Sequence, residues 1–200
     1  MSSTEPIMWL GGEFYFDFHP RRLRQVPLAE YLSEFKNKDN VQILEIGCNE
    51  GQSTLWFIKS LLQGNNSRIT CIDPFNSPRY ITTDLRIKTD KTPEELFHQN
   101  IISKYSDKVK YFKDTSESVL PNLTGPFDIV YVDGCHLEPC VYYDLLLTWP
   151  LMRSDSILVL DDYGNNASNP IRRAANRFFS NKISLIETLH SNHMFIARVK

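Results

Sequence analysis

The stretch Val-Gln-Ile-Leu-Glu-Ile-Gly-Cys-Asn-Glu-Gly, residues 41–51, joins an apolar run to two closely spaced glycines. The run is short and continuously apolar, so it predicts a strand that is buried on both faces of a sheet. A segment of helical period follows Gly51 through about residue 62. Gly47 and Gly51 permit a tight turn and the close approach of a ligand, and the helix start offers free N–H groups. The stretch therefore predicts a strand–turn–helix unit that binds a ligand, with an ordinary glycine turn as the alternative.

Four further apolar runs of strand length follow, and segments of helical period lie between them. The strand candidates are RITCID from Arg68, KVKYFK from Lys108, FDIVYVD from Phe127 and SILVLDD from Ser156. The helix candidates cover about residues 28–35, 51–62, 92 onward, 116–120, 138–149 and 169 onward. Thr92-Pro93 and Asn169-Pro170 each predict an N-cap followed by a proline at the first helical position. Such alternation is typical of a parallel sheet that is covered by helices on both faces.

The C-terminal part of the chain departs from this alternation. Two strand candidates, ISLIETL from Ile183 and HMFIARV from His193, are linked only by residues 190–192. Because so short a link cannot hold a crossover helix, these strands must be antiparallel. The sequence thus predicts an α/β fold, a Rossmann-like doubly wound sheet of seven strands that is mostly parallel and has an antiparallel C-terminal strand.

The composition is that of a globular protein that is almost neutral. The 200 residues are 42% hydrophobic and 23% charged, and 22 basic against 24 acidic side chains give a net charge of −2. No basic excess is available to neutralise phosphates, which argues against nucleic acid as a partner. No apolar run approaches the roughly 18 residues of a membrane span. The N-terminus lacks the pattern of a signal peptide and the four cysteines form no CxxC, so we expect a cytoplasmic protein with reduced thiols.

We expect one domain over residues 27–200 and a separate N-terminal segment over residues 1–26. This segment is rich in aromatic and then basic side chains and shows no clear period. We interpret it as a lid over the acceptor site or as an oligomer interface, which makes a homo-oligomer a possibility. Residues 74–91 form a long connection of the kind that serves as a lid or a binding loop.

Polar side chains follow the second and third predicted strands at their carboxyl ends, which meet along one edge of a parallel sheet. Asp73 ends the second strand, where a carboxylate can accept hydrogen bonds from both hydroxyls of a ribose. The alternative for an Asp before Pro74 is a turn starter. Thr115 and Ser116 open the short helix after the third strand, where they cap that helix or hold the edge of an adenine.

Three carboxylates, those of Asp133, Asp161 and Asp162, end the fourth and fifth predicted strands. Acids that are packed together raise one another's pKa and destabilise the fold unless something neutralises them. A hard divalent cation, most naturally Mg²⁺, does so through oxygen ligands. The alternative is that these acids are turn and cap residues that face water. His136, three residues after Asp133, is a candidate general base.

Taken in order, the elements Glu45-x-Gly47-x-x-x-Gly51, Asp73, Thr115-Ser116, Asp133 and the fifth-strand acids resemble those of class I S-adenosylmethionine-dependent methyltransferases. The likeness covers roughly residues 28–200, and the terminal hairpin agrees with that fold. The stretches FDIVYVDGCH and SILVLDDYG are similar to those of metal-dependent O-methyltransferases. Here the macrolide-sugar (macrocin-type) branch is the closer likeness and the catechol-type branch the more distant one.

This resemblance implies S-adenosylmethionine as the methyl donor and Mg²⁺ or another divalent cation as the metal. The residues implied to bind the methyl donor are Glu45, Gly47, Cys48, Asn49, Gly51, Ser53, Asp73, Thr115, Ser116 and Asp133. The implied metal ligands are Asp133, Asp161 and Asp162, and the catalytic candidates are His136 and Asp133. Ser53 matches a residue that holds the methionine carboxylate, and Ser116 matches an adenine contact.

We therefore predict a Mg²⁺-dependent O-methyltransferase that methylates a hydroxyl of a sugar or of another vicinal diol, since a diol chelates a cation through two oxygens. Its partner would be a small-molecule or glycan acceptor. Two alternatives stay open, a metal-independent small-molecule methyltransferase and a catalytically inactive S-adenosylmethionine-binding partner subunit. A dehydrogenase ranks behind them, because the glycine spacing differs from G-x-G-x-x-G and the terminal hairpin does not fit.

Overall fold

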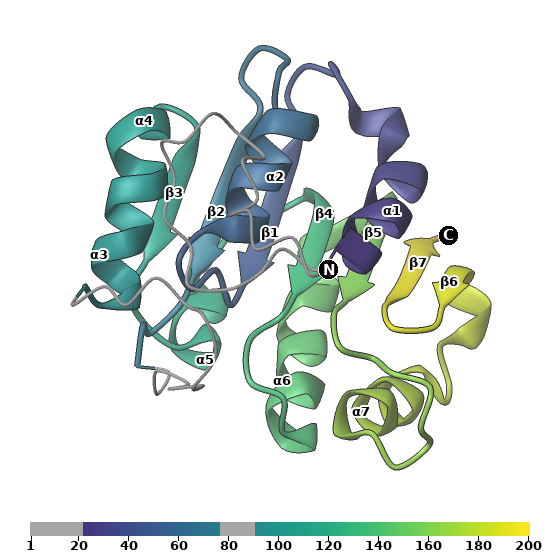
Figure 1. Ribbon diagram of the computed structural model, residues 1–200. Helices are drawn as coiled ribbons and strands as arrows, with labels where there is room; N and C mark the ends of the chain where they lie inside the picture. Colours follow the sequence, from purple (N-terminus) through teal and green to yellow (C-terminus); the bar gives the residue numbers. More distant parts are fainter. Residues whose placement is uncertain (1–21, 77–90) are drawn as a thin grey trace, which may run out of the picture.

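A seven-stranded sheet organises the part of the chain that the computed structural model describes, residues 22–76 and 91–200 (Figure 1). Its strands are β1 (Gln42–Ile46), β2 (Arg68–Ile72), β3 (Val109–Phe112), β4 (Phe127–Val132), β5 (Met152–Leu160), β6 (Ile186–Ser191) and β7 (Phe195–Val199). Their order across the sheet is β3-β2-β1-β4-β5-β7-β6. Strand β7 runs antiparallel to both of its neighbours, and all other pairs are parallel. The predicted Rossmann-like, doubly wound fold is confirmed.

Helices cover both faces of this sheet (Figure 1). The first face carries α1 (Arg22–Tyr31), α2 (Gln52–Ser60), and α3 (Pro93–Phe97) continued through a π-helical turn (His98–Ile102) into α4 (Ser103–Tyr105). The second face carries α5 (Ser116–Val119), α6 (Glu138–Thr148) and α7 (Pro170–Phe179). Short 3₁₀ turns occupy Ser33–Phe35, Leu120–Asn122, Trp149–Leu151 and Ile183–Leu185. Because successive strand side chains point to opposite faces, Ile43 joins the first core layer and Leu44 the second.

The loops that follow the parallel strands lie side by side along the carboxyl edge of the sheet. Backbone hydrogen bonds join them in strand order: Gly47 N–H donates to the Ile72 carbonyl at 2.9 Å, and Asp133 N–H donates to the Ile46 carbonyl at 2.8 Å. The β1 and β4 tips flank the point where the strand order reverses, since β2 and β3 lie to one side and β5 to the other. Ligands of open α/β sheets bind at such a point.

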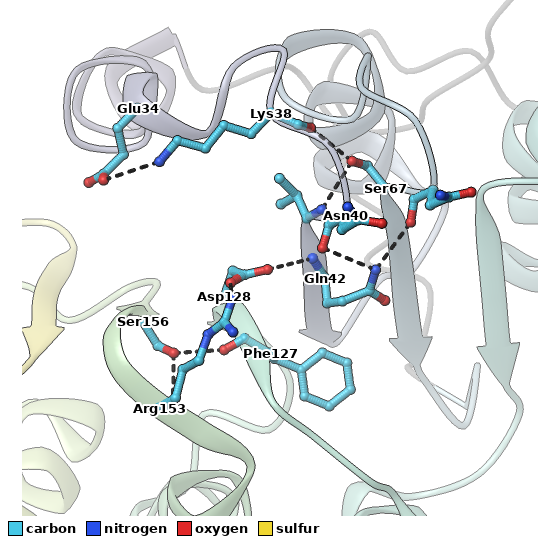
Figure 2. Close-up of polar contacts among 11 residues, drawn as sticks. Glu34, Lys38, Asn40, Gln42, Ser67, Phe127, Asp128, Arg153 and Ser156 are labelled. Atoms are coloured by element: carbon cyan, nitrogen blue, oxygen red, sulfur yellow. Dashed lines mark hydrogen bonds and ion pairs between the residues drawn. The ribbon is translucent and has the colours of Figure 1, made fainter.

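The opposite, amino-terminal edge of the sheet is closed by polar contacts (Figure 2). Asp128, near the start of β4, accepts a hydrogen bond from the Gln42 backbone N–H at 2.8 Å and forms an ion pair with Arg153. Ser156 on β5 donates to the Phe127 carbonyl at 2.8 Å. These groups satisfy one another and fasten neighbouring strands together. This edge therefore stabilises the fold and leaves the carboxyl edge for functional residues.

Three element boundaries differ from those predicted. Helix α1 begins at Arg22 and not near residue 28 as predicted, because the residues before Pro27 are mostly good helix formers. Strand β5 begins four residues early, at Met152, where it pairs with β4. Strand β6 begins at Ile186, because residues 183–185 form a 3₁₀ turn instead of extended chain.

The four cysteines, for which we expect buried free thiols, are free, but only two of them are buried. Cys48 and Cys71 are buried, whereas Cys135 is exposed and Cys140 is half-buried. None of the described helices is long and apolar enough to cross a membrane. The predictions for the N-terminal segment and for the 74–91 connection fall largely on residues 1–21 and 77–90, which lie outside the described residues.

Candidate functional site

The glycine turn after β1 is built from left-handed backbone conformations. Gly47 has a φ of +87° and Gly51 of +88°, and Asn49 between them has a φ of 44°. A Cβ atom on Gly47 would lie 2.2 Å from the backbone carbonyl oxygen of Asp133. Only glycine therefore lets the β1 turn lie against the first residue after β4. The turn predicted to bind the methyl donor and the first predicted metal ligand are in direct contact.

Glu45 lies beneath this turn and connects β1 to the first turn of α2. Its fully buried carboxylate accepts hydrogen bonds from the hydroxyls of Ser53 and Thr54, the latter at 2.6 Å, and from the Cys71 thiol at 3.4 Å. Burial raises the pKa of Glu45 to about 7, although these hydrogen bonds oppose the rise. Two residues predicted to contact the methyl donor, Glu45 and Ser53, thus bond to each other.

Asp73 follows β2 and holds the same turn from its other side. Its Oδ2 accepts from the Asn49 backbone N–H at 2.8 Å, and its Oδ1 accepts from the Phe75 N–H at 2.7 Å. Burial raises the pKa of Asp73, and the backbone hydrogen bonds partly offset the rise. Each carboxylate oxygen carries a second lone pair. Asp73 can therefore shape the turn and still accept hydrogen bonds from a ligand hydroxyl.

Thr115 and Ser116 open α5 at the edge of the second helical layer. Thr115 occupies the N-cap position without a capping side-chain bond, and its hydroxyl lies 3.1 Å from that of Ser118. The Ser116 hydroxyl lies 3.5 Å from Oε2 of Glu117, and it is near enough to the carboxyl group of Asp144 on α6 to lower the pKa of that acid. Asp144 is 1% exposed, and its Oδ1 has no hydrogen-bond partner within the described parts of the chain. The start of α5 thus rests on a buried acid that sequence reasoning missed, because on sequence Asp144 is one polar residue in an apolar helix.

The buried Asp144 predicts a pH-dependent stability. Burial raises its pKa to about 7, so between the unfolded and folded pKa values the native state binds the proton more tightly. The free energy of unfolding is therefore highest below the pKa that Asp144 has in the unfolded chain, and it falls as the pH rises from there to about 7. We expect the gain in stability of Asp144→Asn over the wild type to be larger at pH 8 than at pH 5, by on the order of 2 kcal/mol. Urea unfolding at both pH values measures this difference, and an equal change at both would contradict the prediction.

A cluster of Asp133, His136 and Asp162 lies where β4 and β5 end. The Nε2 atom of His136 is 3.4 Å from Oδ1 of Asp133 and 3.7 Å from Oδ2 of Asp162. The hydrogen bond with Asp133 raises the pKa of His136, and the charges of Asp162 and Asp161 act in the same direction, against the effect of burial. One ligand atom from each residue of the cluster lies within 4.8 Å of the others.

Asp161, the remaining predicted metal ligand, is not brought into this cluster. Its carboxylate is 1% exposed and accepts from the Tyr131 hydroxyl at 2.6 Å and from the Asp162 backbone N–H at 2.7 Å. The group of closely spaced ligand atoms therefore contains Asp162 and not Asp161. We expected three carboxylates to meet here, but only those of Asp133 and Asp162 do so. Asp161 instead holds the backbone of Asp162 in place.

Hydrogen bonds hold the backbone of Asp162 at both its N–H and its carbonyl group. It has a left-handed φ of 50°, and its N–H is held by Asp161. Its carbonyl accepts from Asn169 Nδ2 at 3.0 Å, while Oδ1 of Asn169 caps α7 by accepting from the N–H of Ile171 at 2.9 Å. The sequence predicted the cap at Asn169. The sequence carried no signal for the hydrogen bond from Asn169 Nδ2 to the Asp162 carbonyl. This bond directs Asp162 toward His136.

An open cavity of about 420 Å³ adjoins the cluster on its β5 side. Its lining residues are His136, Asp162, Gly164, the start of α7 (Asn169, Pro170, Ile171) and His193 of the β6–β7 turn. Sequence reasoning did not select His193, because a histidine in a hairpin turn carries no motif.

The cluster fits a divalent cation by the chemistry of its atoms. Two carboxylates supply hard oxygen ligands of the kind that Mg²⁺ takes, and the neighbouring imidazole extends the set to metals such as Mn²⁺. The two acids face one another across His136 at hydrogen-bonding or ion-pair distance. A cation at this position would neutralise the repulsion between them.

Comparison with known proteins agrees with this geometry. Residues 44–163, more than half of the chain, match the family model of a methyltransferase domain. The chain is 24% identical over 121 residues to the O-methyltransferase hkm8 of Aspergillus hancockii, a match that covers 60% of this chain and 42% of that protein. The chain thus matches less than half the length of this curated relative.

Solved structures of methyltransferases share the fold. The O-methyltransferase from Bacillus cereus in complex with SAH superposes with a TM-score of 0.64 at 14% identity, over 92% of this chain and 83% of that one. The MycE methyltransferase from the mycinamycin biosynthetic pathway, in complex with Mg, SAH and mycinamycin VI, gives 0.63 at 16% identity, over 92% and 51%. The chain belongs to the methyltransferase-domain family, and its fold is that of class I S-adenosylmethionine-dependent O-methyltransferases. The family predicted from the sequence is confirmed.

Proposed function

We propose that the protein transfers a methyl group from S-adenosylmethionine to a hydroxyl group, with the help of a divalent cation. The acceptor in this proposal is a vicinal diol such as that of a sugar. One observation carries it: the Gly47 turn lies directly against Asp133, so the methyl-donor site and the acid–histidine cluster share one residue at the tips of adjacent strands.

The methyl donor would lie across the tips of β2, β1 and β4. Adjacent strands are about 4.8 Å apart, so the span from Asp73 to Asp133 is roughly 10 Å, which suits an extended nucleoside with its side chain. Asp73 would accept hydrogen bonds from the ribose, and the N–H groups at the start of α2 would face the polar end of the ligand. Ser116, supported by Asp144, would contact the base.

Asp133 and Asp162 would hold the cation, and Asp161 and Asn169 fix Asp162 for that role. When bound, a divalent cation lowers the pKa of a hydroxyl group that it polarises. A vicinal diol offers such an ion two oxygens, and this favours diols over isolated alcohols as acceptors. MycE, which was solved with Mg, SAH and mycinamycin VI, supports this assignment by its likeness in fold.

His136 would accept the proton that the acceptor hydroxyl loses. Its imidazole is exposed to the cavity side and is held by Asp133, which orients the ring. A base within hydrogen-bonding reach of the hydroxyl contributes about 10²- to 10⁴-fold to such reactions. The remaining contribution of the chain is positioning, because methyl transfer is an in-line displacement between two held reactants.

The experiment that tests this function is a screen for methylated products. The purified protein is incubated with S-adenosylmethionine, MgCl₂ and a panel of monosaccharides, oligosaccharides and catechols, and products are analysed by mass spectrometry. We expect the mass gain of one methylation on at least one diol, with S-adenosylhomocysteine as the co-product. Tight binding of S-adenosylmethionine without turnover on any panel member would favour an inactive partner subunit instead.

A further inference from the structure

We propose that Asn100, on the helical segment before β3, is a positioning residue for the methyl donor, because it holds the glycine turn after β1 in place. The inference rests on the proposed function, which places S-adenosylmethionine at this turn. The Asn100 side chain is fully buried, and its Nδ2 donates a hydrogen bond to the Glu50 carbonyl at 3.1 Å. The two residues are 50 positions apart in the sequence, so the bond ties two separate segments together.

Asn100 lies on the π-helical turn between α3 and α4, within an apolar face. Turns of this kind are rare and frequently occur at functional sites. The other buried residues of the segment are apolar: Leu96, Phe97 and Ile101 are each at most 1% exposed. An amide in such surroundings costs free energy unless it is hydrogen-bonded, and a leucine would fill the space without that cost. Packing alone therefore does not account for an asparagine here, whereas the bond to the turn does.

The bond fixes a peptide plane at the start of α2. The Glu50 carbonyl and the Gly51 N–H belong to one planar peptide group and point in opposite directions. Asn100 holds the carbonyl, and the Gly51 N–H donates to the Cys48 carbonyl at 2.8 Å. Gly51 is the N-cap residue of α2, so this plane sets the direction in which the N–H groups of the first helical turn point. In the proposed function these N–H groups face the polar end of the methyl donor.

The turn depends on contacts from outside, because its own backbone does not favour one conformation. Gly47, Asn49 and Gly51 all have left-handed φ values, of +87°, 44° and +88°. Glycine adopts other conformations equally readily, so a turn with two glycines keeps one conformation only where neighbouring groups hold it. The Ile101 side chain lies directly against the turn, since a Cβ on Gly51 would be 2.3 Å from its Cγ1. Asn100 and Ile101 therefore hold the same end of the turn, one by a hydrogen bond and the other by packing.

The test compares the full wild-type chain with Asn100→Leu and Asn100→Asp. Leucine fills about the same space and cannot donate, and an ionised aspartate places a negative charge against the Glu50 carbonyl. Isothermal titration calorimetry with S-adenosylhomocysteine should give a Kd about tenfold higher for Asn100→Leu, the effect of one lost buried hydrogen bond, and a larger increase for Asn100→Asp.

Two further readouts separate positioning from a general loss of stability. In the ligand-free protein, hydrogen exchange at the Gly51 N–H should be about tenfold faster in Asn100→Leu, because that N–H belongs to the released peptide plane. In turnover assays the KM for S-adenosylmethionine should rise. The kcat and the KM for the acceptor should stay almost unchanged, because the bond lies away from the cluster at the ends of β4 and β5.

Ser156→Ala is the matched control, because the buried Ser156 hydroxyl also donates to a backbone carbonyl, that of Phe127, at the opposite edge of the sheet. It should unfold at a lower urea concentration than the wild type and keep the wild-type Kd and Gly51 exchange rate. A wild-type Kd for both Asn100 variants, or an equal rise in Kd for Ser156→Ala, would overturn the role of Asn100. A raised Kd without methyl transfer by the wild type would support that role and refute the proposed reaction. No binding of S-adenosylhomocysteine to the wild type would overturn both.

Discussion

Replacing Asp162 with asparagine is expected to lower the turnover number at least a hundredfold. The variant keeps the size of the side chain, and asparagine tolerates the left-handed φ of 50° at this position. It removes one of the two carboxylates that would hold the cation and face His136. Removal of one group that stabilises charge in the transition state, such as an oxyanion-hole donor, typically costs about 10²- to 10³-fold. Steady-state rates with saturating S-adenosylmethionine and Mg²⁺ measure the loss.

The control for this variant is Asp155→Asn, on the strand β5 that Asp162 follows. Asp155 is also an acid with a positive φ, 69°, but it is exposed near the opposite end of β5. Its replacement should leave the rate unchanged. Calorimetry should give both variants the wild-type Kd for S-adenosylhomocysteine, because neither residue lies at the β1 turn. A rate for Asp162→Asn within a few-fold of wild type would remove this residue from the mechanism.

Replacing Gly47 with alanine is expected to abolish measurable binding of S-adenosylhomocysteine. The new Cβ would lie 2.2 Å from the Asp133 carbonyl oxygen and 2.6 Å from the Gly134 Cα, both of them backbone atoms that cannot rotate away. The φ of +87° adds strain for any residue with a Cβ. Either the β1 turn or the β4 tip must therefore move, and both belong to the proposed methyl-donor site.

Gly64→Ala separates this effect from a general loss of stability. A Cβ on Gly64 would lie 2.0 Å from the Lys38 carbonyl oxygen, a comparable clash at the opposite edge of the sheet. We expect both variants to unfold at lower urea concentrations than the wild type. The folded Gly64→Ala protein should bind S-adenosylhomocysteine normally, and the folded Gly47→Ala protein should not. Normal binding by Gly47→Ala would show that the ligand lies elsewhere.

The fold was predictable because its signals are local. The apolar runs, the capped helix starts at Thr92 and Asn169, and the short terminal link each follow from a few neighbouring residues. The capping box that joins Thr92 to Glu95 shows how directly such a signal is realised. The order of the strand tips then places Asp73, Gly47 and Asp133 along one edge without further information.

The side-chain arrangement at the site was less predictable, since it depends on contacts between distant segments. Two adjacent acids look equivalent in the sequence, but the Tyr131 hydroxyl draws Asp161 into the core and leaves Asp162 facing His136. Asp144 and His193 carry no local signal either. Their roles depend on the packing of α6 against α5 and on the pairing of β7 with β5.

The central claim is that a cation held by Asp133 and Asp162 supports methyl transfer beside the glycine turn. The most direct measurement is the rate of methyl transfer to the best acceptor from the screen, in EDTA and again after MgCl₂ is added in excess. We expect the rate to fall to background in EDTA and to recover with Mg²⁺, while the Kd for S-adenosylhomocysteine stays the same. A full rate in EDTA, with protein shown by elemental analysis to contain no metal, would contradict the account.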